Sequence, residues 1–358
     1  MPATQTATFA IVPEGPFSWD AACDVVAHFS PISRHWAGSG DPLRVALLLD
    51  GTFEPVAVAL RWDGDRLAGE VAGTRDIEAV SRQVARIFSL DHDGTGFAEL
   101  GRRDPEFERL LAAFPGLRPV CFTSPYECAA WAILSARISM RQAAAIQDRL
   151  IAGFGTRLEV GGGEVWAFPA PERLAELTEL PGLAAIKVER LRGVAAAALD
   201  GLLDARRLRA LGPVDGPASL LSIAGIGPFW SSGIYLRGCG IVDEFADEPL
   251  SIAALGALHG LGDRPDPKTL ARLTDAYRPY RMWATFLLRV AASRGAIPGL
   301  AGREMAIRRG AIGRPPGRHA DRAAHRLLIR GSAASHPARR RSNRSSGDAP
   351  ARSRRLAW

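Results

Sequence analysis

Two glycines, Gly225 and Gly227, lie between two stretches of helical pattern, and Pro228 follows them directly. Glycine can adopt the positive φ that a tight turn between helices needs, and proline favours the first position of a helix. Peptide N–H groups at the start of such a helix attract an anion such as a phosphate. Residues 223–237 therefore predict a helix, a hairpin turn and a second helix able to hold a phosphate. An ordinary turn that caps two helices would carry the same glycines.

Two acidic residues, Asp247 and Glu248, come directly before Pro249 at the predicted start of the next helix. A carboxylate in a cleft can stabilise the positive charge that develops on a sugar when its glycosidic bond breaks, and it can orient a water molecule. Either acid could supply such a carboxylate. The alternative is that both acids only complement the dipole of the helix that follows them.

The motifs around this hairpin resemble, in the same order, those of the HhH-GPD superfamily of DNA glycosylases, and within it the 3-methyladenine DNA glycosylase II type. The hairpin resembles the family's Leu-Pro-Gly-Ile-Gly turn. The other matching segments are Pro16-Phe17-Ser18-Trp19-Asp20, Gly116-Leu117-Arg118-Pro119, Ser124-Pro125-Tyr126-Glu127, Ala132-Ile133-Leu134-Ser135 followed by Ser139, and Tyr277-Arg278-Pro279-Tyr280-Arg281. The resemblance covers about residues 8–295. It implies an enzyme that flips alkylated bases out of double-stranded DNA and releases them by hydrolysis in base-excision repair.

The resemblance also implies which residues touch DNA. The expected DNA contacts are Gly225, Ile226, Gly227, Phe229, Trp230, Arg137 and Ser139. The expected lining of the base pocket is Tyr280, Phe229, Trp283 and Tyr126, because aromatic rings attract an electron-poor alkylated base. Arg137 stands where the family carries an apolar wedge, and covering a helix end is its alternative role. For Trp283 the alternative is packing in the core.

Three departures from the family pattern bear on the activity. Glu248 aligns with the family's catalytic Asp, so the resemblance implies that Glu248 is the catalytic carboxylate, with Asp247 as the second choice. Ala136 replaces a Gln of the family. Phe229 stands where glycosylases that also cut the strand carry a lysine that forms a Schiff base, so we expect no lyase activity. Two alternatives stay open: a non-catalytic protein that binds damaged or distorted DNA, and a glycosylase for deaminated or oxidised bases.

Composition limits the cofactors and the cellular location. The four cysteines are scattered without the spacing of metal ligands, which excludes the four-cysteine iron–sulfur loop of some relatives. We therefore expect no metal and no cofactor, apart from the option, implied by the family, of a monovalent cation on the hairpin carbonyls. No apolar run approaches the length of a membrane span, and no signal peptide is recognisable. We expect a monomer in the bacterial cytoplasm, associated with the nucleoid.

The chain predicts an α+β fold with three parts. Residues 1–103 show β-rich runs at 7–12, 44–49, 55–62 and 66–72 and helices at 19–29 and 75–88, and the family implies a fold like the TATA-binding protein here. Residues 104–298 predict an all-helical glycosylase domain without strands. Residues 299–358 form a basic low-complexity tail: from Arg303 onward there are fifteen Arg and three acids, so the net charge of +7 belongs to the tail and the rest is acidic. We expect the tail to be disordered, and either to bind DNA without specificity or to have no function.

Overall fold

An antiparallel sheet forms the N-terminal part of this computed structural model, which describes residues 7–28, 36–37, 42–246 and 248–300. The elements are β1 (Ala7–Ile11), α1 (Trp19–His28), β2 (Trp36–Ala37), β3 (Leu43–Leu48), β4 (Pro55–Asp63), β5 (Arg66–Ala72) and α2 (Ile77–Ile87). The strand order is β1-β5-β4-β3-β2, and all neighbours run antiparallel. This part confirms the expected α+β class. The predicted strands and helices start and end within two residues of the observed ones, whereas β2 has no predicted counterpart.

Glycines form the turns on both sides of β4. Gly51 and Gly64 have φ of 87° and 68°, which residues other than glycine rarely adopt. The strand between them is buried over residues 56–60, and Val56, Val58 and Leu60 are fully covered. The sheet therefore owes its register to glycine turns and an apolar central strand.

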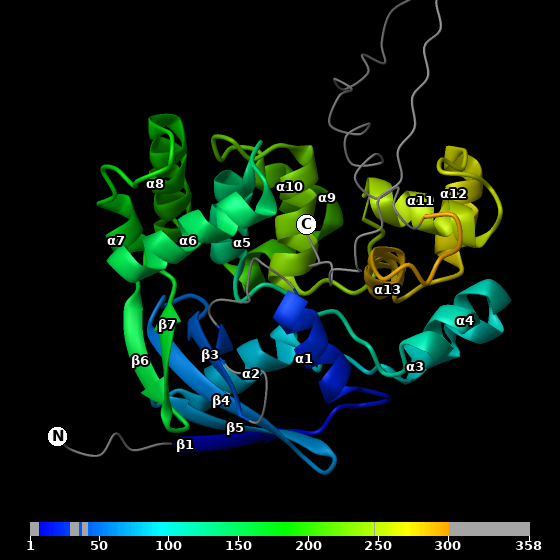
Figure 1. Cartoon of the computed structure of the whole chain (residues 1–358), viewed down its shortest axis with the longest axis horizontal. Coiled ribbons are helices and arrows are strands. Elements are labelled where there is room, and N and C mark those ends of the chain that lie inside the picture. The colour runs from blue at the N-terminus through cyan, green and yellow to red at the C-terminus, as the bar shows by residue number, and fades with distance from the viewer. Residues whose placement is uncertain (1–6, 29–35, 38–41, 247, 301–358) are drawn as a thin grey trace, which may run out of the picture.

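Helices dominate the rest of the described chain (Figure 1). They are α3 (Thr95–Ala98), the 3₁₀ helix η1 (Glu99–Arg102), α4 (Pro105–Ala113), α5 (Pro125–Ser135), α6 (Met140–Phe154), α7 (Pro171–Ala175), α8 (Ala185–Leu199), α9 (Ala205–Leu220), α10 (Pro228–Gly233), the π-helix η2 (Ile234–Gly238), α11 (Pro249–Leu258), α12 (Pro267–Asp275) and α13 (Arg281–Ser293). Several begin with a capping side chain followed by proline, as at Ser124-Pro125 and Asp266-Pro267. In Figure 1 α11, α12 and α13 lie on one side of the helical part and α5 to α10 on the other.

The prediction that residues 104–298 contain no strand is wrong. Strands β6 (Thr156–Val160) and β7 (Gly163–Ala167) form a hairpin, and the side chain of Arg44 in β3 donates to the carbonyls of Val160 and Gly161. Both turn glycines, Gly161 and Gly162, have positive φ, as a tight hairpin turn requires. The hairpin packs against the N-terminal sheet, and its five-residue strands are too short to stand out in a helical sequence context.

Buried arginines join the two parts of the fold. The Arg86 guanidinium donates to Gly238 at the end of η2, to Thr123 before α5, and to Asp50 after β3. Every residue of α5 is buried, so this helix forms the centre of the core.

No described helix is both long and apolar enough to cross a membrane. The predicted tail, apart from Gly299 and Leu300, lies outside the described residues.

Candidate active site

A tight hairpin joins α9 to α10, as the sequence predicts. Gly225 has φ of 92°, and a Cβ atom added there would lie 2.7 Å from Cδ of Arg190 and 2.9 Å from a methyl group of Ile133. Gly227 is the N-terminal cap of α10 with φ of −101°, and no atom lies within 4 Å of a Cβ added to it. Pro228 occupies the first turn of α10. Gly225 therefore serves the packing of the turn, whereas Gly227 leaves the start of α10 open.

The second hairpin helix continues as a π-helix that carries Arg237. Only 2% of Arg237 is exposed, its guanidinium carbon lies 4.7 Å from the centre of the Phe286 ring, and it donates to the carbonyl of Val120. Burial, chiefly, lowers the pKa of Arg237 to about 10, so the side chain stays charged at neutral pH. π-Helical turns are rare and frequently mark functional sites. The sequence analysis did not single out Arg237.

Glu248 caps the N-terminus of α11, and both of its carboxylate oxygens are engaged. Oε2 accepts hydrogen bonds from the backbone N–H of Ser251 at 2.8 Å and from its hydroxyl at 2.7 Å. Oε1 lies 2.7 Å from Nη1 of Arg289, and both side chains are buried. The sequence predicted the carboxylate and its capping position but not its arginine partner. Asp247, the second candidate, lies outside the described residues.

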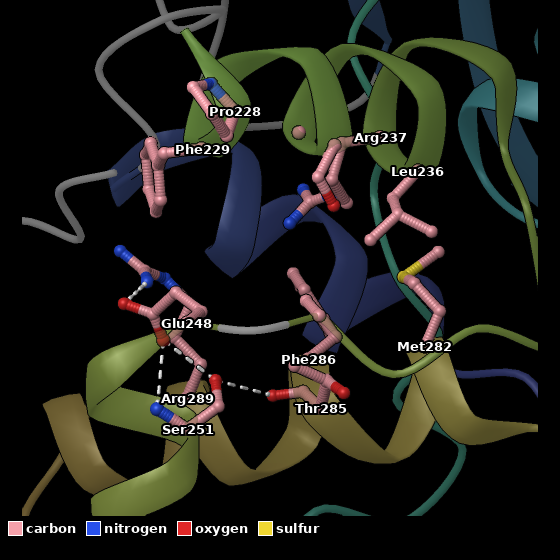
Figure 2. A pocket seen from close by; sticks show the side chains of 13 residues that line it. Pro228, Phe229, Leu236, Arg237, Glu248, Ser251, Met282, Thr285, Phe286 and Arg289 are labelled. Atoms are coloured by element: carbon pink, nitrogen blue, oxygen red, sulfur yellow. Dashed lines mark hydrogen bonds and ion pairs between the residues drawn. The ribbon is translucent and has the colours of Figure 1, made fainter. Parts of the chain in front are cut away.

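A cavity of about 190 Å³ brings the hairpin helix and this carboxylate together. It is lined by Pro228, Phe229, Ser232, Gly233, Leu236, Arg237, Ala246, Glu248, Ser251, Met282, Thr285, Phe286 and Arg289. Figure 2 shows Phe229 and Arg237 on one side and Glu248, Ser251 and Arg289 on the other. The cavity has room for several water molecules, each of which takes about 30 Å³ in the liquid. Its charged lining consists of two guanidinium groups and one carboxylate, which gives it a formal charge of +1.

Of the aromatic residues predicted to form a base pocket, Phe229 lines this cavity, with 45% of its surface exposed. Trp230 is partly buried with its ring 5.6 Å from that of Phe229, but it does not line the cavity.

Three of the predicted pocket residues lie in the core instead. Tyr280 donates to the carbonyl of Asp93 at 2.9 Å, and Trp283 is 1% exposed under the guanidinium of Arg118. Tyr126 is fully buried, and its hydroxyl donates to Pro169 at 2.9 Å. The placement of these rings in a base pocket is thus corrected: they are covered by other side chains, and core packing, which was the alternative for Trp283, describes all three.

The two remaining DNA-contact predictions lie at the turn between α5 and α6. Arg137 is exposed and has φ of 60°, an uncommon value for a residue other than glycine. Ser139 caps α6 and forms a reciprocal capping box with Gln142. Ile226 of the hairpin is buried, so it can offer DNA its backbone but not its side chain.

Arg289, which the sequence analysis missed, belongs to a pattern that could have revealed it. In the otherwise apolar α13, the polar residues Arg281, Thr285 and Arg289 recur every fourth position. Residues four apart share one face of a helix, so this stripe predicts a polar partner. Thr285 and Arg289 do line the cavity, and Arg281 forms an ion pair with Asp243 at 2.7 Å. The stripe does not indicate which carboxylate is the partner, because Glu248 lies 41 positions earlier in the chain.

The chain resembles known proteins both in sequence and in structure. No family model matches it. A DNA-3-methyladenine glycosylase of Bacillus subtilis (strain 168) is 27% identical over 217 residues, which cover 59% of this chain and 71% of that protein. A 3-methyladenine DNA-glycosylase from Archaeoglobus fulgidus has a similar structure, with a TM-score of 0.66, 21% identity, and coverage of 79% of this chain and 98% of that one.

A third comparison extends the structural similarity. The Clostridium acetobutylicum 8-oxoguanine glycosylase/lyase, solved in complex with double-stranded DNA, matches with a TM-score of 0.58 at 16% identity and covers 78% of this chain and 93% of its own. At these identities the solved structures support the fold. The Bacillus protein adds a likeness in sequence: the chain is similar to a 3-methyladenine DNA glycosylase over 217 residues.

Proposed function

We propose that the chain is a monofunctional DNA glycosylase that flips alkylated bases out of double-stranded DNA and releases them by hydrolysis. The observation that carries the proposal is the position of Glu248, whose buried carboxylate lines the same cavity as Phe229 of the hairpin helix. The homology to 3-methyladenine DNA glycosylases supports the substrate class. Incubation with methylated duplex DNA tests it: free alkylated bases and abasic sites should accumulate.

In this proposal the Glu248 carboxylate acts on the sugar. As the N-glycosidic bond lengthens, positive charge develops on the sugar ring, and a fixed carboxylate stabilises that charge. The ion pair with Arg289 and the two hydrogen bonds from Ser251 hold the Glu248 carboxylate in place. Since the carboxylate is already oriented, little reorganisation is needed when the charge appears. A water molecule then attacks the sugar carbon and completes the hydrolysis.

The two lysines of the chain are badly placed for a lyase step. Nζ of Lys187 donates to the carbonyls of Leu134 and Ala136, and Lys268 is exposed in the first turn of α12. Neither lines the cavity. Because a lyase of the known kind needs a lysine that forms a Schiff base with the sugar, we expect no covalent protein–DNA complex on borohydride treatment of the reaction, and no strand breaks until the abasic sites are cleaved with alkali. A trapped complex would contradict the monofunctional assignment.

The two hairpin glycines predict opposite variant behaviour. Gly227→Ala places a methyl group in open space at an ordinary φ, so the melting temperature should change by no more than about 3 °C. The same methyl group keeps a phosphate away from the start of α10, so affinity for duplex DNA should fall about tenfold. Gly225→Ala is the matched control, because its Cβ collides with Arg190 and Ile133 at positive φ. It should lower the melting temperature by about 5 °C or more. Unchanged DNA affinity in a folded Gly227→Ala would exclude the hairpin as the phosphate site.

The hairpin is also the place for the monovalent cation that the family implies. Backbone carbonyls are suitable ligands for a hard cation, and the turn offers several, although the Ile223 carbonyl already accepts a hydrogen bond from Ile226 at 3.0 Å. The presence of such an ion stays a prediction, as does the monomeric state.

The positive formal charge of the cavity favours one alternative, a glycosylase for deaminated or oxidised bases. Arg237 and Arg289 outnumber Glu248, so a cationic alkylated base would enter a site with a formal charge of +1. A neutral deaminated or oxidised base meets no such repulsion. A panel of duplexes with one modified base each, measured under single turnover, separates the two classes. Faster release of a cationic methylpurine than of hypoxanthine supports the alkylated class, and the reverse order supports the alternative.

The second alternative, a DNA-binding protein without catalysis, is favoured by the ion pair at Glu248. A carboxylate engaged by Ser251 and Arg289 could serve the fold alone. The two roles differ in what Glu248→Gln does: base release disappears if Glu248 is catalytic, whereas a binding protein releases no base before or after the substitution.

A further inference from the structure

The turn between α5 and α6 has the geometry of a type II β-turn over residues 135–138. Ala136 has φ of −57° and ψ of 121°, and Arg137 has φ of 60°. The N–H of Ile138 donates to the carbonyl of Ser135 across the turn at 3.4 Å. The third residue of a type II turn needs positive φ and is usually glycine. A long side chain is disfavoured there, so some contact must hold the turn in this form.

Lys187 of α8 makes that contact. Its ammonium donates to the carbonyl of Leu134 at 2.8 Å and to the carbonyl of Ala136 at 2.8 Å. The Ala136 carbonyl belongs to the central peptide of the turn. That peptide faces opposite ways in type I and type II turns, because ψ of the second residue is about −30° in one and about +120° in the other. A cation on this carbonyl therefore selects type II, and with it the positive φ of Arg137.

Lysine is rare in this chain, so its presence at position 187 indicates a specific role. Of the 45 Lys and Arg residues in the chain, only Lys187 and Lys268 are lysine. A compact ammonium with three rotatable N–H bonds can reach two carbonyls at once, whereas a planar guanidinium is wider and suits carboxylates and phosphates. Burial, and then repulsion from Arg190, lower the pKa of Lys187. The two hydrogen bonds to carbonyls offset the cost of burying the ammonium. An arginine would be a poor substitute in this contact.

This turn lies close to the hairpin. The Arg190 side chain, one helical turn beyond Lys187 on α8, passes within 2.7 Å of the place where a Cβ on Gly225 would stand, and Ile133 of α5 touches the same point. The end of α5, the first two turns of α8 and the hairpin turn thus converge. Arg137 is exposed, and within the described part of the chain its side chain has no hydrogen bond or ion pair.

We propose that Lys187 is a positioning residue for DNA binding, which fixes the type II turn and thereby directs Arg137 toward the DNA strand held at the hairpin. The inference rests on the proposed function in one respect, that Arg137 contacts DNA. Lys187 itself need not touch DNA. Its effect on affinity passes through Arg137, and this distinguishes it from a residue that only stabilises the fold.

A double-mutant cycle on DNA affinity tests the proposal. The ligand is a duplex with one tetrahydrofuran abasic-site analogue, and Kd is measured by fluorescence anisotropy for wild type, Arg137→Gln, Lys187→Met and the double variant. We expect each single substitution to weaken binding about tenfold and the double variant to match the single ones within about twofold. Lys187→Arg should bind DNA as weakly as Lys187→Met does. Lys268→Met is the matched control and should bind DNA like wild type. Melting temperatures confirm that each variant is folded.

Two results would overturn the proposal: additive effects, with the double variant weakened about a hundredfold, or wild-type affinity in Lys187→Met. If Lys187→Met does not fold, Lys187→Ala, which also removes both hydrogen bonds to the turn, takes its place in the cycle with the same criteria. Base release by the wild type is measured in parallel. A wild type that binds the duplex but releases no base would contradict the proposed glycosylase activity while leaving the coupling between Lys187 and Arg137 intact.

Discussion

Replacing Glu248 by Gln should reduce the rate of base release by roughly 10³-fold while DNA affinity stays within about threefold of wild type. The substitution keeps the shape of the side chain and removes the charge that faces the sugar in the proposed mechanism. Gln can still accept hydrogen bonds from Ser251, which preserves the cap of α11. Single-turnover release of a methylated base and anisotropy with the abasic-analogue duplex measure the two quantities separately.

Two control variants are needed to interpret the effect of Glu248→Gln on base release. Glu248→Asp restores the residue of the related family and keeps the negative charge, so it should retain activity within about tenfold. Glu176→Gln removes an exposed carboxylate that pairs only with Arg173 on the surface, and it should change nothing. If Glu248→Gln released bases as fast as wild type, another group would have to be the catalytic carboxylate, and Asp247 would be the first candidate.

The second large effect is expected for Arg289→Met. Without its guanidinium, the buried carboxylate of Glu248 loses its nearest cation and takes up a proton more readily. A protonated carboxyl cannot stabilise a cationic sugar. The ionised, active form is then present only at higher pH, so the acidic limb of the pH–rate profile should move upward. We expect base release to fall about a hundredfold at pH 6 and clearly less at pH 8.5.

Controls separate this electrostatic effect from a loss of stability. Arg289→Lys keeps a cation near Glu248 and should leave the acidic limb close to that of wild type. Arg272→Met removes an exposed arginine of α12 and should leave both rate and profile unchanged. Thermal melts at each pH show whether the protein is folded. An equal loss of activity for Arg289→Met at pH 6 and pH 8.5, in a folded protein, would mean that Arg289 does not act through the ionisation of Glu248.

The features predicted correctly from the sequence are those set by local chemistry. Gly225 marks the hairpin because its backbone has positive φ, and Glu248 marks a helix start because Pro249 follows it. The strands and turns of the N-terminal sheet follow from apolar alternation and from Asp-Gly pairs. The hairpin β6–β7 was missed although its Gly161-Gly162 turn is a strong signal, because its short strands lie among helices.

The features predicted wrongly or missed depend on contacts between distant segments. Trp283 and Tyr280 were placed in a base pocket by family position, yet their neighbours Phe97 and Arg118, more than 150 positions earlier, enclose them. The pairing of Glu248 with Arg289 joins α11 to α13, and the polar stripe of α13 predicts a partner without identifying Glu248. Local patterns identify a capping carboxylate or an aromatic segment, but only the packing of the helices decides which of them lines a cavity.

The most direct test of the account is a comparison of products from duplex DNA that carries a single alkylated base, with wild type and Glu248→Gln run side by side. Free base is quantified by chromatography, and strand integrity by denaturing electrophoresis before and after alkali. The account predicts free base and an equal amount of abasic sites in unbroken strands from wild type, and neither from the variant. Equal base release by both proteins, or none by either, would contradict the assignment of Glu248 as the catalytic carboxylate.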